Sequence, residues 1–474
     1  MANAQLGGKI RRLRRERKLT QAQMAQELAI SGSYLNLIER NQRPITVPVL
    51  MKLAQKFKID IDTFGADDDG RLIADLSEAF SDPLFDNHDV IQSELDELVA
   101  LSPNLGEAVL ALYQAWRKGA GGEKQDATSE SEGPAGIPSE EVSDFLEQRG
   151  NHFPFLEEAA EGLWRDNGLT LETLTQDLIK ILSQRYGVDV AVDPAERMGG
   201  TVREFNPLTR RLTLSELLPT PSRTFQLAHQ MALFGWRKEI DAAVAGFKFT
   251  SDDATVLARI ALANYFAAAV LMPYERFREA AVATRYDLTV LEHRFGVSFE
   301  QVCHRLTTLK RPGAEGIAFH LIRVDIAGNI SKRFGGSGIR IARFGAACPR
   351  WNVYDAFATP GMLRVQISEM PDGARFFCIA RTVSQPGRTG RFGAIGHRAS
   401  RLAIGLGCAL SQAKDFVHSE GLSLDDPRIV TPIGVSCRLC DRADCSDRAA
   451  PSIRRRLAMD ENKRGVSAYS MGAK

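Results

Sequence analysis

The sequence predicts a multidomain protein with an all-α head, a mostly α middle domain that contains a small sheet, and an α+β C-terminal domain. A length of 474 residues suits about three domains. A polar linker interrupts the helical pattern, and near residue 313 the apolar periodicity changes from helical to alternating. We place the boundaries at 1–66 (head), 67–118 (acidic helical connector), 119–138 (flexible linker), 139–312 (middle domain) and 313–474 (C-terminal domain).

The head divides into short amphipathic helices. Ile10 and Leu13 mark an apolar stripe on the first, and Thr20 with Gln23 three residues later predicts a capping box for the second. Ser31 is the predicted cap of a third helix.

The charge is strongly asymmetric although the whole chain carries only +1. Residues 1–58 hold twelve Lys and Arg against three Glu, whereas residues 60–107 hold fourteen Asp and Glu against one Arg. A basic head indicates a polyanion partner, for which nucleic acid is the usual candidate. The alternative is a solvated charged face without a partner.

Three motifs in the head point to double-stranded DNA. T-Q-x-x-M-A, S-x-S-Y-L and I-E-R-N-Q-R resemble the repressor/Cro-type helix-turn-helix over residues 8–65. The resemblance implies that the third helix enters the major groove of an operator. By position, the expected base readers are Ser33, Tyr34 and Asn36, and the expected phosphate contacts are Gln21, Arg40 and Arg43. A helix-turn-helix used only for protein contacts is the alternative.

The acidic connector is predicted to be helical and is a possible dimerisation element. Its candidate buried positions are Leu95, Leu98, Leu105, Val109, Leu112 and Trp116. Because repressors of this type usually read two half-sites, we expect a homodimer or a higher homo-oligomer.

The middle domain contains the run TFQLAHQMAL, which has the form of a metallopeptidase helix without its chemistry. Short strands around 188–215 precede it, and this order resembles the zinc-peptidase-like domain of bacterial regulators. That chemistry needs H-E-x-x-H and a third ligand. Here His229 is followed by Gln230 in place of the base and by Leu233 in place of the second histidine, and positions 259–262 directly before the A-N-Y-F-A run contain no acid. We therefore expect no enzyme, and a former active-site cleft used for packing or for a ligand. A zinc endopeptidase acting through His229 is the weaker alternative.

The C-terminal domain is predicted to be an antiparallel sheet with hairpins at 327–329 and 371–373. A strand, RLAIGLGC, is expected to lead through Gly407 and Cys408 into a helix over 409–420.

A cysteine cluster in this domain indicates a metal centre. Cys437 and Cys440 form a C-x2-C pair, Cys445 follows, and Cys408 is the candidate fourth ligand. Four thiolates suit zinc or an iron–sulfur cluster. Free or buried thiols are the alternative, as is a redox- or metal-sensing regulator. The odd count of seven cysteines and the lack of an apolar signal segment in residues 1–13 favour a reducing, cytoplasmic location. The longest apolar stretch, 260–273, is too short to predict a membrane span.

Two Gly- and Arg-rich stretches, 331–345 and 381–398, have the composition of phosphate-binding turns. Their candidate ligand-binding residues are Lys332, Arg333, Arg340 and Arg381.

The whole chain resembles the bacterial short-chain fatty acyl-CoA regulators. The resemblance rests on C-P-x-W-N at 348–352, P-D-G at 371–373, I-A-R-T at 379–382 and I-G-x-x-C-R-x-C-x-R-x-D-C at 433–445. It implies a transcription factor that senses a short-chain acyl-CoA such as propionyl-CoA and controls genes of short-chain fatty acid metabolism. It does not specify which residues hold the ligand.

Overall fold

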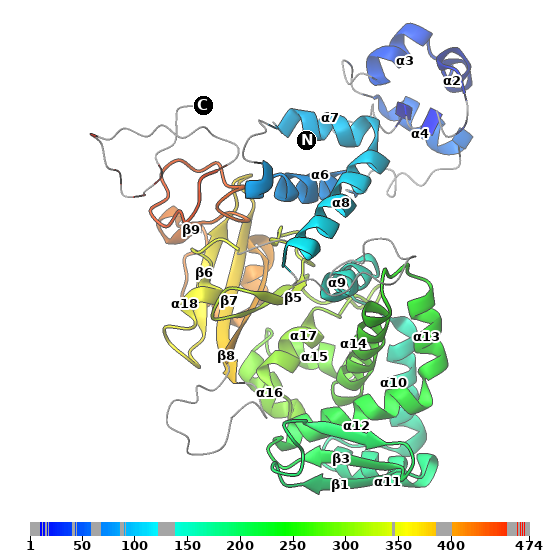
Figure 1. Cartoon of the computed structure of the whole chain (residues 1–474), viewed down its shortest axis with the longest axis vertical. Coiled ribbons are helices and arrows are strands. Elements are labelled where there is room, and N and C mark those ends of the chain that lie inside the picture. Colours follow the sequence, from blue (N-terminus) through cyan, green and yellow to red (C-terminus); the bar gives the residue numbers. More distant parts are fainter. Residues whose placement is uncertain are drawn as a thin grey trace. The chain divides into compact units, whose positions relative to one another are not determined.

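The structure is a computed structural model that describes residues 19–39, 45–57, 68–85, 92–121, 138–343, 347–384 and 401–452, with isolated residues at 10–17, 43, 90 and 462–469. The chain divides into two compact units, Met1–Thr128 and Ser129–Lys474. The linker predicted at 119–138 falls mostly outside the described residues. Figure 1 labels the elements of both units.

The first unit begins with the helix-turn-helix. It consists of α2 (Gln21–Leu28), α3 (Gly32–Glu39) and α4 (Val47–Phe57). The predicted capping box is present, since the Thr20 side chain accepts from the Gln23 backbone and the Gln23 side chain accepts from the Thr20 backbone. Ser31 Oγ likewise accepts from the Tyr34 backbone at the start of α3. The shared core is made of buried apolar side chains, namely Ile10, Leu13, Met24, Ala25, Leu28, Leu35, Ile38 and Leu53.

The connector is a group of three helices that pack against one another: α6 (Asp68–Ala79), α7 (Gln92–Leu101) and α8 (Pro103–Gly121), with a 3-10 turn at Pro83–Phe85. Leu95 is buried as predicted. The burial predicted for Leu105, Leu112 and Trp116 is wrong, because their exposed fractions are 55%, 70% and 41%. α8 instead buries Leu110 and Tyr113. Gly106 of α8 allows α6 to approach closely, because a Cβ added at Gly106 would lie 3.0 Å from the side chain of Leu76.

The second unit starts with a helical layer and a small sheet. Its helices are α9 (Pro138–Gln148), α10 (Pro154–Asn167), α11 (Leu174–Tyr186), α12 (Thr220–Gly235), α13 (Arg237–Ala245), α14 (Asp252–Leu271), α15 (Tyr274–Ala283), α16 (Leu288–Phe295) and α17 (Phe299–Leu306). The strands are β1 (Asp189–Asp193), β2 (Arg203–Asn206) and β3 (Arg211–Ser215), in the order β1-β3-β2. β2 and β3 form an antiparallel hairpin, and β1 pairs in parallel with the other edge of β3.

Helix α14 is the central helix of this layer and contacts α9, α10, α12 and α13. By length and composition the whole helix could cross a membrane, although the stretch 260–273 alone is too short. Ala258, Leu262, Phe266 and Val270 are nevertheless buried in the protein core, which explains its apolar sequence.

The C-terminal part is a six-stranded sheet in the order β5-β4-β8-β7-β6-β9, shown in yellow to orange in Figure 1. The strands are β4 (His320–Asp325), β5 (Ile330–Phe334), β6 (Arg364–Glu369), β7 (Arg375–Ser384), β8 (Arg401–Ala409) and β9 (Val430–Pro432), with a short helix α18 (Asn352–Asp355). All neighbours are antiparallel except β6 and β9. Both predicted hairpins are present, and Gly328 (φ +86°) and Gly373 (φ +84°) supply the left-handed backbone of their turns.

The helix predicted over 409–420 is wrong. β8 continues through Gly407 and Cys408, and only 3-10 turns follow, at Leu410–Asp415 and Val417–Ser419. The His320 ring packs against Gly407 of this strand. An added Cβ at Gly407 would lie 2.5 Å from His320 Cε1. The glycine therefore marks a close approach across the sheet.

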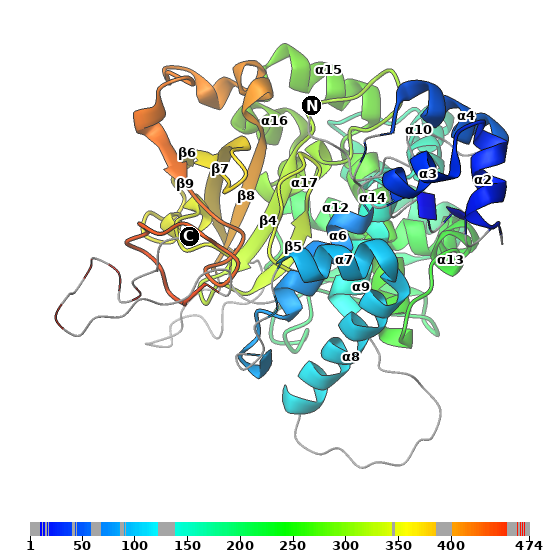
Figure 2. The ribbon, with the colours of Figure 1, turned by 90° about the horizontal axis from the view of Figure 1, so that it is seen from above.

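The two faces of the six-stranded sheet are both buried. One face, with Leu321, Phe377 and Leu406, continues the core of the helical layer. The opposite face, with Val324 and Cys378, has its own core together with Trp351 of the loop before α18. Figure 2 shows α17 beside β4 and β8. The C-terminal domain, predicted as distinct from the middle domain, thus shares one continuous core with it.

Candidate functional site

The N-terminal turn of α3 presents the expected DNA-reading side chains. Ser33 is exposed, and Tyr34 and Asn36 are half-buried. Gln21 Nε2 donates to Asn36 Oδ1 at 3.3 Å, which ties α2 to the candidate reading helix. Arg43 is exposed, and Arg40 lies outside the described residues.

A largely buried ion pair supports this surface from behind. Arg14 donates to both carboxylate oxygens of Glu39, at 2.6 and 3.0 Å, and Gln21 donates to the same carboxylate at 3.2 Å. The hydrogen bonds to Glu39 raise the pKa of Arg14. Arg14, α2 and α3 are therefore tied together through the Glu39 carboxylate.

The former metallopeptidase position is on α12, where the neighbours of His229 include the amide of Asn264 and the cation of Arg203. His229 is buried, and its Nδ1 lies 2.9 Å from Asn264 Oδ1. Burial lowers the pKa of His229 to about 4, and the positive charge of Arg203 contributes to this shift. Within the described part of the chain, neither His229 Nε2 nor Arg203 Nη1 has a hydrogen-bond partner.

These residues do not fit a zinc ion. A guanidinium close to the imidazole repels a divalent cation, and Gln230 is a buried amide where a base is needed. Arg259, four residues before the A-N-Y-F-A run, is paired with Asp241 at 2.6 Å.

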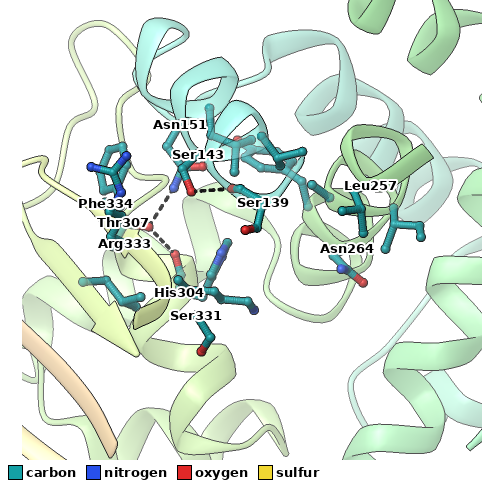
Figure 3. Close-up of a pocket in the computed structure, with 17 residues that line it drawn as sticks. Ser139, Ser143, Asn151, Leu257, Asn264, His304, Thr307, Ser331, Arg333 and Phe334 are labelled. Atoms are coloured by element: carbon teal, nitrogen blue, oxygen red, sulfur yellow. Dashed lines mark hydrogen bonds between the residues drawn. The ribbon is translucent and has the colours of Figure 1, made fainter. Parts of the chain in front are cut away.

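Two adjoining cavities lie between the helical layer and the six-stranded sheet. The first has a volume of about 220 Å³ and is lined by α9, α14, α17, β4 and β5. Its apolar wall consists of Val142, Leu146, Leu257, Ile260, Leu321 and Phe334. Figure 3 shows Leu257 and Asn264 opposite Arg333 and Phe334, with His304 and Ser331 between them.

The second cavity has a volume of about 370 Å³ and extends along the former peptidase helix. Phe225 and Gln226 of α12 line it together with Ser298 and Gln301 at the start of α17. Asn264, His304 and Lys332 line both cavities, so these three side chains lie where the cavities meet. We refer to the two cavities together as the cleft.

The cleft contains the cationic side chains of Lys332 and Arg333, the carboxylate of Glu300 and neutral polar groups. Lys332 lies 3.3 Å from Glu300, which also pairs with Arg323 at 2.7 Å. Burial lowers the pKa of His304 to about 3, and the charge of Lys332 adds to this effect, so the imidazole is neutral. Arg333 lies 3.6 Å from Asp144, and its buried Nη2 lacks a hydrogen-bond partner among the described residues.

The predicted phosphate-binding residues do not gather at one point. Lys332 and Arg333 line the cleft, whereas the described part of the structure places Arg340 and Arg381 outside both lining sets. Arg340 is exposed. Arg381 pairs with Glu292 at 3.0 Å and lies 3.9 Å from the centre of the Phe299 ring. Sequence reasoning missed Asn264 and His304, although the single Asn in an apolar helix was a signal for the first.

Cys408, the candidate fourth metal ligand, lies on the opposite face of the sheet from Cys348. It points into the core shared with the helical layer, where burial raises its pKa to about 12. Cys348 and the Ile433 that leads into the cysteine loop belong to the core of the opposite face. Burial raises the pKa of Cys348, and the neighbouring thiols of Cys437 and Cys440 add to this effect.

Two arginines fix the cysteine loop through its backbone. Arg448 donates to the carbonyl oxygens of Cys437 at 2.9 Å and Cys440 at 3.1 Å. Arg442 donates to those of Glu369 and Met370 on the neighbouring strand turn. An added Cβ at Gly434 would lie 3.0 Å from Cys440 Sγ. Among the residues that the structure describes, no three His, Cys, Asp or Glu side chains already form a metal-binding group.

A helix-turn-helix followed by a peptidase-like layer with an internal cleft defines a transcriptional regulator. Three family descriptions match successive parts of the chain: helix-turn-helix (residues 10–64), IrrE N-terminal-like domain (183–307), and short-chain fatty acyl coenzyme A regulator, C-terminal (308–469). The chain belongs to the family of short-chain fatty acyl-CoA regulators.

Relatives of similar length support this assignment. The HTH-type transcriptional regulator PrpR of Mycobacterium tuberculosis is 41% identical over 98% of this chain and 95% of its own. RamB of the same organism is 40% identical over 99% of both chains. The propionyl-CoA carboxylase regulator of Cereibacter sphaeroides is 38% identical over 98% of both. A solved Mycobacterium tuberculosis transcriptional regulator, 41% identical, superposes with a TM-score of 0.66 over 70% of this chain and 99% of that one.

Proposed function

We propose that the cleft binds a short-chain acyl-CoA thioester and that its occupancy changes the affinity of the helix-turn-helix for an operator. The observation that carries the proposal is the junction of a small apolar cavity with a larger one at Asn264, His304 and Lys332. An acyl chain fits the first cavity, and the pantetheine arm fits the second. A volume of about 220 Å³ favours a short chain over a long one.

Helix α9 is the cleft-lining helix that is nearest in sequence to the DNA-binding unit. Val142 and Leu146 of α9 line the first cavity, and α9 is the first described helix after the connector. Arg343 pairs with Glu140 of α9 at 3.2 Å and also contacts Asp144. A ligand shifts DNA affinity only if it prefers one of two arrangements, and couplings of about 1–3 kcal/mol are typical.

Calorimetric titration with propionyl-CoA tests the binding, with free coenzyme A and a long-chain acyl-CoA as controls. Micromolar binding that is selective for the short thioester supports the proposal. DNA affinity is then measured with and without propionyl-CoA on a fragment that the protein selects in vitro. Equal binding of all three compounds, or DNA affinity that does not respond to the ligand, contradicts it.

Operator reading is assigned to Ser33, Tyr34 and Asn36, with phosphate contacts from Gln21, Arg40 and Arg43. The exposure of Ser33 and Arg43 and the positive charge of the head support this part of the proposal.

The exposed apolar stripe of α8 is the proposed contact between two copies of the chain. Leu105, Leu112 and Trp116 follow a spacing of seven and four residues, which is the seam of a helix pair. We expect Leu112→Glu to shift the protein from dimer to monomer in light scattering, because a charge in the seam is costly to bury. Leu84→Glu, at a position exposed to 44%, is the control. A monomeric unmodified protein, or an unchanged mass of Leu112→Glu, refutes the contact.

Cys348, Cys437, Cys440 and Cys445 are the proposed ligands of an iron–sulfur cluster or a zinc ion. Thiols are the donors that both centres prefer. Two observations support this set: Cys437 and Cys440 are close enough to raise the pKa of Cys348, and Gly434 packs closely against Cys440. Such a centre would tie the loop before α18 to the cysteine loop and would make the regulator sensitive to metal supply or redox state.

Cys348→Ser is expected to remove most of the bound metal, whereas Cys408→Ser is expected to keep it. Metal analysis and the visible spectrum of anaerobically purified protein measure the content per folded chain. Loss of metal in Cys408→Ser but not in Cys348→Ser would instead identify Cys408 as the fourth ligand. Equal metal content in both variants and in the Cys437→Ser protein would show that the cysteines hold no metal.

A further inference from the structure

Lys332 occupies a special position in the cleft because it lies at the junction of the two cavities with Asn264 and His304. In a short acyl-CoA, the thioester is the boundary between the acyl chain and the pantetheine arm. With the acyl chain in the first cavity and the arm in the second, the thioester carbonyl lies at this junction. The placement rests on the proposed function.

The surroundings of Lys332 favour an amine that can react. Its side chain keeps 40% of its surface accessible, and its ion-pair partner is Glu300 at 3.3 Å. Although the side chain is only partly buried, its loss of solvent and the nearby charge of Arg323 lower the pKa of Lys332, while Glu300 opposes them. A lowered pKa raises the fraction of uncharged amine, which is the nucleophilic form.

Two groups next to Lys332 can accept a proton. Glu300 is a carboxylate whose pKa is held below its usual value, although burial alone would raise it, because Lys332 and Arg323 surround it. His304 is a neutral imidazole, and its ring nitrogens make no hydrogen bond within the described part of the chain. One of them therefore remains available to move a proton between the amine and a leaving thiolate.

We propose that Lys332 is an acyl-acceptor site, which takes the short acyl group from the bound acyl-CoA. The Nζ lone pair attacks the thioester carbonyl carbon, and the carbon–sulfur bond breaks. The proton lost by the nitrogen passes through His304 or Glu300 to the sulfur. The products are an amide on Lys332 and free coenzyme A, so the reaction needs no oxidant, reductant or further reactant.

Acylation would leave a lasting change in the cleft. The amide carries no charge, so the ion pair of Lys332 with Glu300 is lost, whereas that of Arg323 with Glu300 at 2.7 Å can remain. The modified side chain also fills part of the junction. The regulator would then retain a record of earlier acyl-CoA after the free ligand has gone.

Mass spectrometry of the full-length protein incubated with propionyl-CoA tests the proposal. The expected result is a mass gain of one propionyl group, located by peptide mapping at Lys332 and absent from Lys332→Arg. Lys310 is the matched control, because burial also lowers its pKa but the described cavity linings do not include it. Glu300→Gln and His304→Phe are expected to slow the gain if either group carries the proton.

Each outcome separates this site from the effector proposal. Calorimetric binding without any mass gain overturns the acyl-acceptor role and leaves the effector role intact. Modification spread equally over Lys332 and Lys310 also overturns it, because it indicates unselective chemistry of reactive amines. A protein that neither binds propionyl-CoA nor gains mass overturns the proposed function itself.

Discussion

Glu157→Gln is expected to destabilise the second unit by about 3–5 kcal/mol, which is the usual cost of breaking a buried ion pair from one side. Arg305 Nη1 and Nη2 donate to the two carboxylate oxygens of Glu157 at 2.6 and 2.9 Å. Both side chains are essentially inaccessible, at 0% and 1% exposure. Tyr265 adds a hydrogen bond to the same carboxylate at 2.6 Å. The substitution leaves a buried guanidinium without its counter-charge.

Urea unfolding measures this loss, and Glu158→Gln on the exposed side of the same helix is the matched control. We expect the control to change the free energy of unfolding by less than about 0.5 kcal/mol. The double substitution Glu157→Leu with Arg305→Met should recover part of the loss, because it removes both charges. If Glu157→Gln and Glu158→Gln lower the free energy of unfolding equally, the buried ion pair does not stabilise the second unit.

The same pair predicts how stability depends on pH. Burial alone would raise the pKa of Glu157, but the charge and hydrogen bonds of Arg305 outweigh burial and lower the pKa. The stabilisation is therefore present above the pKa of the unfolded carboxyl, about 4.3, and is lost as the pH falls through the lower folded value. The Glu157→Gln protein should lose less stability on acidification than the unmodified protein.

Arg333→Ala is expected to weaken propionyl-CoA binding by about 10- to 100-fold. Arg333 lines the first cavity, and its guanidinium lies 3.6 Å from Asp144. A hydrogen bond from this charged donor to the thioester carbonyl of the ligand contributes about 1.5–3 kcal/mol, which corresponds to this change in affinity. Calorimetric titration gives the dissociation constants directly.

Arg340→Ala is the matched control, because Arg340 follows the same strand in sequence but is exposed. We expect its affinity for propionyl-CoA to equal that of the unmodified protein. If Arg340→Ala weakens binding as much as Arg333→Ala does, the ligand lies outside the cleft. An unchanged affinity in Arg333→Ala shows that this donor does not contact the ligand.

The sequence by itself determined the features that depend on neighbouring residues. Thr20 and Gln23 specify a helix start through their own capping box, and Gly328 and Gly373 specify hairpin turns through their backbone freedom. The absence of the H-E-x-x-H motif from α12 was also visible, because the ligands of that motif have a fixed spacing. Local periodicity wrongly predicted a helix over 409–420. The strand before it instead continues through Gly407, which packs against His320, and only 3-10 turns follow.

The tertiary structure decided which distant residues meet. Cys348 rather than Cys408 lies on the side of the cysteine loop, because alternate residues of a strand point to opposite faces and the strand order is not sequential. Leu105 and Leu112 are apolar in sequence, but the packing of α6 against Gly106 selected the other face of α8 for burial. The cleft brings together Asn264, His304 and Lys332 from α14, α17 and β5. Periodicity shows that a face is apolar, but only long-range packing determines what covers it.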